Sequence, residues 1–464
     1  MDLKPFVHIF RTPGEYYCYD VNRSTLIKIN EDLFEDIKNE KYGENEHYKK
    51  LLNSGYLCPK DDSEITIEHP VSSYVEEYLE SNVQQLILQV TQNCNLRCKY
   101  CVYSGSYRNR THTNKRMSFQ MAVRAIDFFA DHSKMTSVAN ISFYGGEPLL
   151  EFQLIKDLVE YCDKKLAGKE IKYNITTNAT LLTSEIAKFL SDNNFALNIS
   201  LDGPKSVQDN SRVFADGDRG TFDTVIRNVE MIEKEYPQYI ESVSFNAVID
   251  KRNDFTCSSN FFTYEFLKNA VVTSTGVSDR DSNDDVTLQD AFYINYNYEL
   301  FKSFLSCVGL LDKNHVSKLV RQYVWLLKTN IHDRITGNYH RRGYCHPNGP
   351  CLAGANRLFV TVDGEFYPCE RVSETNDAYN IGNLVDGFSS DKVRTLLNTG
   401  KMNEDECKNC WAINLCGTCA ADFGDENGLS PQKKHEKCKY ARLEVEARLK
   451  EYCILREYGY YFDE

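Results

Sequence analysis

The pattern of apolar and polar residues in the first 75 positions predicts a small module of three strands and two helices. The strand-like segments are FVHIFRT, EYYCYD and STLIKI, and turn residues Pro13-Gly14 and Asn22-Arg23 separate them. The helical segments NEDLFEDIKN and ENEHYKKLLNSG follow, and Gly55 ends the second. The hydrophilic stretch at about 59–73 is predicted to be a linker.

From Gln84 onward, strand-like segments alternate with helical ones. The strand-like segments are LILQVT, NISFY, IKYNITTN, ALNISLD and SVSFNAVI. The helical ones are SFQMAVRAIDFFADH, which Ser118 caps, FQLIKDLVEYCDKKL, SEIAKFLSDNN and TFDTVIRNVEMIEKEY. This alternation predicts a parallel sheet or barrel, whose chemistry lies in loops at the carboxyl ends of the strands. The segments CNLRCKYC, GGEP, TNAT and SLDG each follow a strand directly.

The alternating pattern stops between residues 250 and 300. The acidic segment VSDRDSNDDVTLQD is predicted to be a surface loop, and FYINYNYELFKSFLS and VSKLVRQYVWLL to form a helical bridge. The expected domains are a front module at 1–75, an α/β domain at 84–300, the bridge at 301–344, a cysteine-rich domain at 345–440 and a C-terminal helix or tail at 441–464.

Composition narrows the class of protein. A chain of 464 residues is too long for one core. It has no apolar run of membrane-spanning length and its first residues do not resemble a signal peptide, so we expect a cytoplasmic protein without a membrane partner. The net charge of −13 argues against a nucleic-acid partner, because such binding requires neutralisation of phosphates.

Seventeen cysteines are many for a chain without an export signal, and in a reducing cytosol they indicate metal binding rather than disulfides. Three lie in CNLRCKYC, as Cys94, Cys98 and Cys101. Eight lie near the C-terminus: Cys345, Cys351, Cys369, Cys407, Cys410, Cys416, Cys419 and Cys438. The scattered others are expected to be small buried apolar residues: Cys18, Cys58, Cys162, Cys257, Cys307 and Cys453.

The three cysteines of CNLRCKYC suggest an iron–sulfur site with an open position. A [4Fe–4S] cluster ordinarily takes four thiolates, so three would leave one iron able to bind a small molecule. The alternative is a zinc site that a distant ligand such as His112 completes.

The C-x3-C-x2-C spacing resembles the signature of the radical SAM enzymes. The resemblance implies that the open iron chelates S-adenosylmethionine, which one electron cleaves to a 5′-deoxyadenosyl radical. Glu147 and the glycines of GGEP would receive the ammonium group, Tyr100 would flank the adenine, and Arg212 would pair with the carboxylate unless it is an ordinary surface arginine. The implied contacts of S-adenosylmethionine are Tyr100, Gly145, Gly146, Glu147, Asn178, Ser200 and Arg212.

The C-terminal cysteines resemble a SPASM domain. Cys407, Cys410, Cys416 and Cys419 alone could form a zinc knuckle, but Cys351, Gly364, Cys369 and Cys438 extend the array to the family pattern. The family has three residues before its sixth cysteine and this chain has two. The resemblance implies two auxiliary [4Fe–4S] clusters, and so three in all. One would use Cys345, Cys351, Cys369 and Cys419, with His346 competing for the place of Cys345; the other would use Cys407, Cys410, Cys416 and Cys438.

Glu370 follows Cys369 directly. In sulfatase-maturing relatives an acidic residue at this place serves as a base, so the resemblance implies that role for Glu370. The alternative is a surface glutamate paired with Arg371.

The front module resembles a winged-helix-like RiPP recognition element, which binds the leader of a ribosomally made precursor peptide by adding it to a strand edge, here residues 24–29. The segment HIFRTPGEYYCYDVN is similar to the start of Cys-rich-peptide maturases. The implied fold is α/β, a partial (β/α)6 TIM-like barrel between this module and the SPASM domain. The implied function is that of a radical SAM oxidoreductase that forms Cys thioether crosslinks of the ranthipeptide or sactipeptide kind, with a reducing donor such as flavodoxin or ferredoxin.

Two alternatives remain open at this point. One is a sulfatase-type maturase, which oxidises Cys or Ser to formylglycine. The other, from a different class, is a non-catalytic zinc-binding scaffold.

Overall fold

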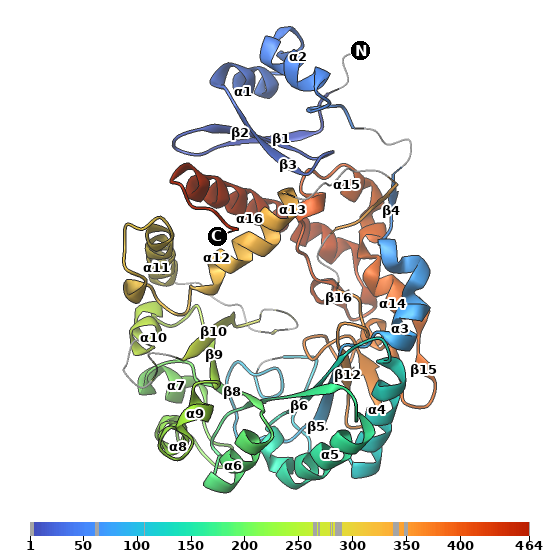
Figure 1. Ribbon diagram of the computed structural model, residues 1–464, viewed down its shortest axis with the longest axis vertical. Coiled ribbons are helices and arrows are strands. Elements are labelled where there is room, and N and C mark those ends of the chain that lie inside the picture. Colours follow the sequence, from blue (N-terminus) through green and yellow to red (C-terminus); the bar gives the residue numbers. More distant parts are fainter. Residues whose placement is uncertain are drawn as a thin grey trace.

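The computed structural model describes residues 4–60, 65–105, 107–262, 267, 270–278, 280, 282–283, 290–336, 343–347 and 351–463. The front module has the predicted three strands and two helices (Figure 1). An antiparallel sheet in the order β1-β2-β3 precedes two short helices capped by Asn30 and Asn45. The elements are β1 (Val7–Arg11), β2 (Tyr16–Asp20), β3 (Thr25–Ile29), α1 (Glu31–Lys38) and α2 (Glu46–Asn53).

The central domain is a parallel sheet with helices between its strands, as the alternating pattern predicts. Six parallel strands follow one another in the order β5 to β10. The strands are β5 (Gln85–Thr91), β6 (Val138–Gly145), β7 (Glu170–Thr177), β8 (Ala196–Ser200), β9 (Ser244–Ile249) and β10 (Val271–Gly276). The helices are α4 (Phe119–His132), α5 (Phe152–Lys165), α6 (Ser184–Asp192), α7 (Lys205–Ser211), α8 (Phe222–Glu235), α9 (Pro237–Ile240) and α10 (Phe255–Phe261). Ser118 caps α4, accepting a hydrogen bond from the backbone N–H of Met121.

Strand β10 corrects the expectation that the pattern ends at residue 250. Its sequence VVTSTG alternates weakly and lacks large apolar residues, so it carries little strand signal by itself. Pairing with β9 forms it, from Val271 beside Ser244 to Gly276 beside Ile249. Most of the predicted acidic loop that follows lies outside the described residues.

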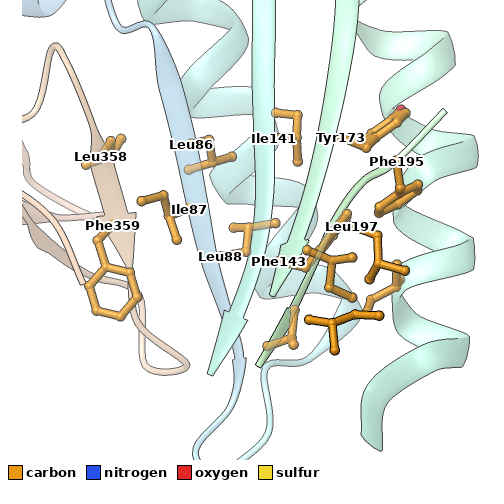
Figure 2. Packing of buried hydrophobic residues seen from close by; sticks show 14 of the residues in the cluster. Leu86, Ile87, Leu88, Ile141, Phe143, Tyr173, Phe195, Leu197, Leu358 and Phe359 are labelled. Carbon is orange, nitrogen blue, oxygen red and sulfur yellow. The ribbon is translucent and has the colours of Figure 1, made fainter. Parts of the chain in front are cut away.

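The cysteine-rich region continues the same sheet. Strand β12 (Leu358–Val360) pairs in parallel with β5, placing Leu358 beside Leu86 and Phe359 beside Ile87 (Figure 2). The sheet goes on through β13 (Glu365–Tyr367), β14 (Gly382–Asn383) and β15 (Gly387–Phe388). One apolar core runs under all of these strands. The loop after β5 and the loop after β13 therefore follow strands of the same sheet.

The stretch at 59–73 is not a free linker in its described part. β4 (Thr66–Ile67) pairs with β11 (Tyr344–Cys345), and Ile65 and Ile67 are buried. These isoleucines are the apolar positions of a polar segment, and pairing with a distant strand buries them. A short helix, α3 (Val75–Ser81), then leads into β5.

Helices join the central domain to the front module (Figure 1). The bridge contains α11 (Asp290–Cys307), α12 (Gln322–Leu327), a π-helical turn at Lys328–His332 and α13 (Asp333–Ile335). The C-terminal part adds α14 (Ser390–Leu397), α15 (Glu404–Lys408), β16 (Gly424–Asp425), β17 (Gly428–Leu429) and α16 (Pro431–Glu457). Phe10, Tyr19 and Val21 of the front module share an apolar cluster with residues of α16 and with Cys407 of α15. Among the described residues, no helix combines the length and apolar character needed to cross a membrane.

Candidate functional site

The first three cysteines share one loop at the carboxyl end of β5. Cys94 and Cys98 are buried, Cys101 is half-buried, and all three are free thiols. Burial raises the pKa of Cys94 and of Cys98 to about 12, and the Cys101 thiol adds to both shifts. Such thiols stay protonated unless a metal takes the proton's place, since coordination deprotonates a thiol. The donor set and its burial therefore fit a [4Fe–4S] cluster.

His112 does not join these thiols. Its ring stacks on Tyr103, and its Nδ1 lies 3.1 Å from the carbonyl oxygen of Gln92. Across the ranges that the structure describes, no three Cys, His, Asp or Glu side chains stand as close together as a single metal ion requires.

The GGEP loop lies directly against the cysteine loop. The N–H groups of Gly146 and Glu147 donate to the carbonyls of Thr91 and Asn93, each at 3.0 Å. A Cβ atom on Gly145, whose φ is +148°, would come within 2.1 Å of the Thr91 oxygen, and one on Gly146 within 2.2 Å of the Asn93 oxygen. Only glycine allows this approach, so the two glycines set the position of the cysteine loop.

Glu147 has a buried carboxylate that accepts three hydrogen bonds from the protein. The donors are the Thr177 hydroxyl at 2.6 Å, the Asn178 N–H at 2.8 Å and the Leu149 N–H at 3.0 Å. Burial raises the pKa of Glu147 to about 6, although these hydrogen bonds oppose the rise. A carboxylate offers about four acceptor positions, so Glu147 has capacity for one more donor, such as an ammonium group.

Asn178 and Ser200 occupy the ends of neighbouring strands. The Asn178 amide donates to Asn95 Oδ1 at 2.9 Å and lies 3.9 Å from Cys94 Sγ. It thus holds the cysteine loop as well as facing the site. Ser200, the last residue of β8, is buried.

Arg212 and Tyr100 meet at a carboxylate that sequence reasoning missed. The Arg212 guanidinium forms a two-pronged ion pair with Asp202, at 3.0 and 3.1 Å, and the Tyr100 hydroxyl donates to Asp202 as well. The Arg212 side chain is only 8% exposed, so it is not an ordinary surface arginine. Asp202 stands in the SLDG segment directly after β8, and its place after a strand was the available signal.

A second group of buried polar residues that sequence reasoning missed lies between the cysteine loop and the C-terminal region. Arg110 pairs with Glu374 at 2.9 Å, and Gln89 donates to both Tyr103 and Glu374. Burial raises the pKa of Tyr144, the residue before Gly145, and the Tyr103 hydroxyl raises it further. These residues come from distant segments, so only the folded chain brings them together.

The auxiliary cysteines fall into two groups. Burial raises the pKa of Cys369 to about 11, and nearby Cys351 and Cys419 contribute to the rise. Burial likewise raises the pKa of Cys410 to about 11 and that of Cys438 to about 12, with Cys407 and Cys416 adding to both shifts. The structure thus brings together Cys351, Cys369 and Cys419 on one side, and Cys407, Cys410, Cys416 and Cys438 on the other.

Cys345 lies on the short strand β11, which pairs with β4. It is buried in the apolar cluster that contains Tyr19 and Cys407. His346 beside it packs edge-on against His69, with ring centroids 5.0 Å apart. The residues that separate Cys345 from Cys351 are only partly among the described ones.

The surroundings of Glu370 bear on both roles expected for it, a base and a surface residue paired with Arg371. Its carboxylate is 3.2 Å from Arg357 and 3.6 Å from Arg371. It also acts on the thiols of Cys351 and Cys369 and on the Tyr144 hydroxyl. Glu370 is therefore close both to the first auxiliary group and to Tyr144, the residue before the GGEP loop.

Comparisons with known proteins agree with this geometry. Residues 88–255 match the radical SAM superfamily, and residues 351–419 match the SPASM iron–sulfur cluster-binding domain. A cysteine-type anaerobic sulfatase-maturating enzyme of Clostridium novyi is 25% identical over 72% of this chain and 87% of its own length. The radical SAM cyclopropyl synthase TigE of Paramaledivibacter caminithermalis is 24% identical over 83% of this chain and 80% of its own.

A solved structure has the same fold. Native anSMEcpe with bound AdoMet and Cp18Cys peptide superposes with a TM-score of 0.55 at 22% identity, covering 79% of this chain and 98% of that one. Together with the cysteine loop, the GGEP loop and the two auxiliary groups, the two family matches show that the chain combines a domain of the radical SAM superfamily with a SPASM domain.

Proposed function

We propose that this enzyme modifies a ribosomally made precursor peptide and closes thioether bonds between its cysteines and carbon atoms of other residues. Cys94, Cys98 and Cys101 would hold the radical SAM cluster, and the two C-terminal groups would hold auxiliary clusters, giving three [4Fe–4S] clusters. When bound, the first cluster and S-adenosylmethionine supply a radical that removes a hydrogen atom from the substrate.

The observation that carries this proposal is the front module. Strand β3 stands at an edge of its sheet, the arrangement that strand addition by a peptide requires. Beside it, Tyr17 and Lys28 line a groove of about 970 Å³ whose other walls include Phe301 and Phe304 of α11. Since 79% of this chain accounts for 98% of the anSMEcpe structure, about a fifth of this chain lacks a counterpart there, enough for the front module.

The reaction balances as follows. One C–S bond would replace a C–H bond and an S–H bond of the peptide. The hydrogen atom would go to the radical that S-adenosylmethionine supplies, the thiol proton to a base, and one electron to an acceptor. Glu370 is the proposed base, because its carboxylate stands beside the thiols of Cys351 and Cys369 and can accept a proton there. The auxiliary group of Cys351, Cys369 and Cys419 adjoins it and is the proposed acceptor site.

The test is mass spectrometry of a short Cys-rich peptide encoded beside the gene, after reaction with the anaerobically reconstituted enzyme. We expect a product lighter by about two hydrogens per bond that resists thiol alkylation even after reduction, because thioethers do not undergo thiol exchange. A mass loss that a reductant reverses would mean disulfides and would contradict the proposal. Glu370→Gln should slow crosslinking; a normal rate would remove only the base assignment.

Formylglycine formation is the second candidate, since cysteine-type sulfatase-maturating enzymes match most of the chain. Its product carries an aldehyde, which hydroxylamine captures and a thioether does not. An aldehyde product formed equally well with and without the leader would favour this candidate.

A further inference from the structure

Lys434 is a buried cation beside one of the auxiliary cysteines. It lies in the first turns of α16, where only 2% of it is exposed. Its ammonium nitrogen is 3.2 Å from Cys407 Sγ and 3.5 Å from the carbonyl oxygen of Gly400. Lys434 also stands four residues before Cys438 on the same helix, a spacing that puts both on one face.

A lysine in this position requires a compensating negative charge. Charged side chains are rarely buried unless they are paired, because removal from water is costly. Among the described residues, the Lys434 ammonium group donates hydrogen bonds to the Cys407 sulfur and the Gly400 carbonyl oxygen, and none to a carboxylate. A Cys407 thiolate, the form that binds iron, supplies the missing charge.

Arg442 of α16, which lies near the same cysteine group, differs from Lys434 because it has a carboxylate partner. Arg442 acts on Cys410, but it also pairs with Glu406 at 3.4 Å. Glu406 in turn binds His435 at 2.9 Å, so Arg442 belongs to a mixed-charge network near the surface. Lys434 therefore presents the less compensated positive charge to this cysteine group.

We propose that Lys434 donates a charge-assisted N–H···S hydrogen bond to Cys407 and raises the reduction potential of the cluster held by Cys407, Cys410, Cys416 and Cys438. Reduction adds one negative charge to a cluster, and a buried cation stabilises that charge. Charge, hydrogen bonds to sulfur and solvent exposure are the factors by which a protein sets a cluster potential. A raised reduction potential makes this cluster easier to reduce, so that it accepts electrons more readily. The inference goes beyond the proposed function, because it does not depend on the product.

The test is a potentiometric titration of the reconstituted enzyme, followed by electron paramagnetic resonance and carried out without substrate. Lys434→Met removes the charge and the donor, and Lys434→Arg keeps both. The control is Lys450→Met, which removes a cation sixteen residues further along α16, where Lys450 pairs with Glu446. We expect the midpoint potential of one cluster to fall in Lys434→Met, and all midpoints to stay close to wild type in Lys434→Arg and Lys450→Met.

Unchanged midpoints in Lys434→Met would overturn the proposal, and so would equal shifts in the Lys450→Met control. Loss of about four irons in Lys434→Met together with retention in Lys434→Arg would support it, because the charge would then be needed to hold that cluster. Loss of the cluster in both variants would make Lys434 a packing residue and overturn the proposal. A failure of thioether formation would not affect these titrations, so the two hypotheses can fail independently.

Discussion

At the scale of residues, the sequence predicts groups that act within one loop and misses partners from elsewhere in the chain. The cysteine loop and the glycines of GGEP can be recognised in the sequence because each is a short segment that resembles a family motif. Asp202 is not, because its importance comes from the meeting of Tyr100 and Arg212 at its carboxylate. Lys434 resembles any lysine of a polar helix until the fold places it against Cys407.

Gly146→Ala tests the contact between the GGEP loop and the cysteine loop. A Cβ atom would lie 2.2 Å from the Asn93 carbonyl oxygen, so the cysteine loop must move. We expect cleavage of S-adenosylmethionine to fall by roughly 10²-fold, the effect that a displacement of about 1 Å can have. The control is Gly217→Ala, where a Cβ atom meets nothing within 4 Å. Equal activity of both variants would contradict this role of Gly146.

The three cysteines of the first loop can be tested together. Replacing Cys94, Cys98 and Cys101 by Ala should remove about four of roughly twelve irons per reconstituted chain and abolish cleavage of S-adenosylmethionine. Iron analysis and detection of 5′-deoxyadenosine measure the two effects. Unchanged cleavage would be incompatible with the assignment of this loop as the radical SAM site.

At the scale of elements, strands and helices with strong periodicity are predictable, and those that depend on a distant partner are not. The helix that Ser118 begins follows from its cap and its apolar face. β10 and β4 escape prediction because pairing with β9 and β11 forms them, and their own residues signal it weakly. For Cys345 the resemblance implies a place in the first auxiliary group, and the fold adds that β11 pairs with β4 and that this cysteine is buried in the apolar cluster that contains Tyr19.

The contact between β1 and the loop of the second auxiliary group should make stability depend on pH. His8 stacks on Trp411 with ring centroids 3.6 Å apart, and its Nε2 lies 3.1 Å from Glu446. Burial lowers the pKa of His8 below its usual 6.5, although Glu446 opposes this. Below pH 6.5 the unfolded chain therefore binds more protons at this residue, and the His8 contribution to stability is lost as the pH falls from 6.5 toward the folded pKa.

His8→Phe measures this contribution, because phenylalanine keeps an aromatic ring over Trp411 but cannot take a proton. We expect the thermal midpoint of the wild type to fall more steeply between about pH 7.5 and pH 5.5 than that of the variant. Parallel curves for the two proteins would show that His8 has the same pKa in the folded and the unfolded chain, which would contradict this prediction.

At the scale of the whole molecule, the sheet that runs from β10 through β5 to β15 joins the radical site to the auxiliary groups. The sequence predicts the two parts separately, each from its cysteines. It cannot predict that β12 pairs with β5, because both are short apolar runs far apart in the chain. This pairing helps to explain how Glu370, which follows β13 and pairs with Arg357, comes close to Tyr144 and Arg110.

The front module can be tested by removing residues 1–60. The cut should leave β4 in place, because Thr66 and Ile67 pair with Tyr344 and Cys345. We expect the shortened enzyme to cleave S-adenosylmethionine with a strong reductant, since the cysteine loop and the GGEP loop lie elsewhere. Processing of the full precursor should be lost, because binding energy from the remote leader positions the reacting residues.

The matched control for this truncation is the intact enzyme with a precursor that lacks its leader. If the module acts by holding the leader, the two experiments remove the same contact and should lower crosslinking to the same extent. Removing the module also uncovers the apolar surface that Phe10 and Tyr19 bury, so the shortened enzyme should be less stable as well. The leaderless peptide causes no such loss of stability. Undiminished crosslinking of that peptide by the intact enzyme would therefore exclude a leader-binding role whatever the fate of the truncated protein.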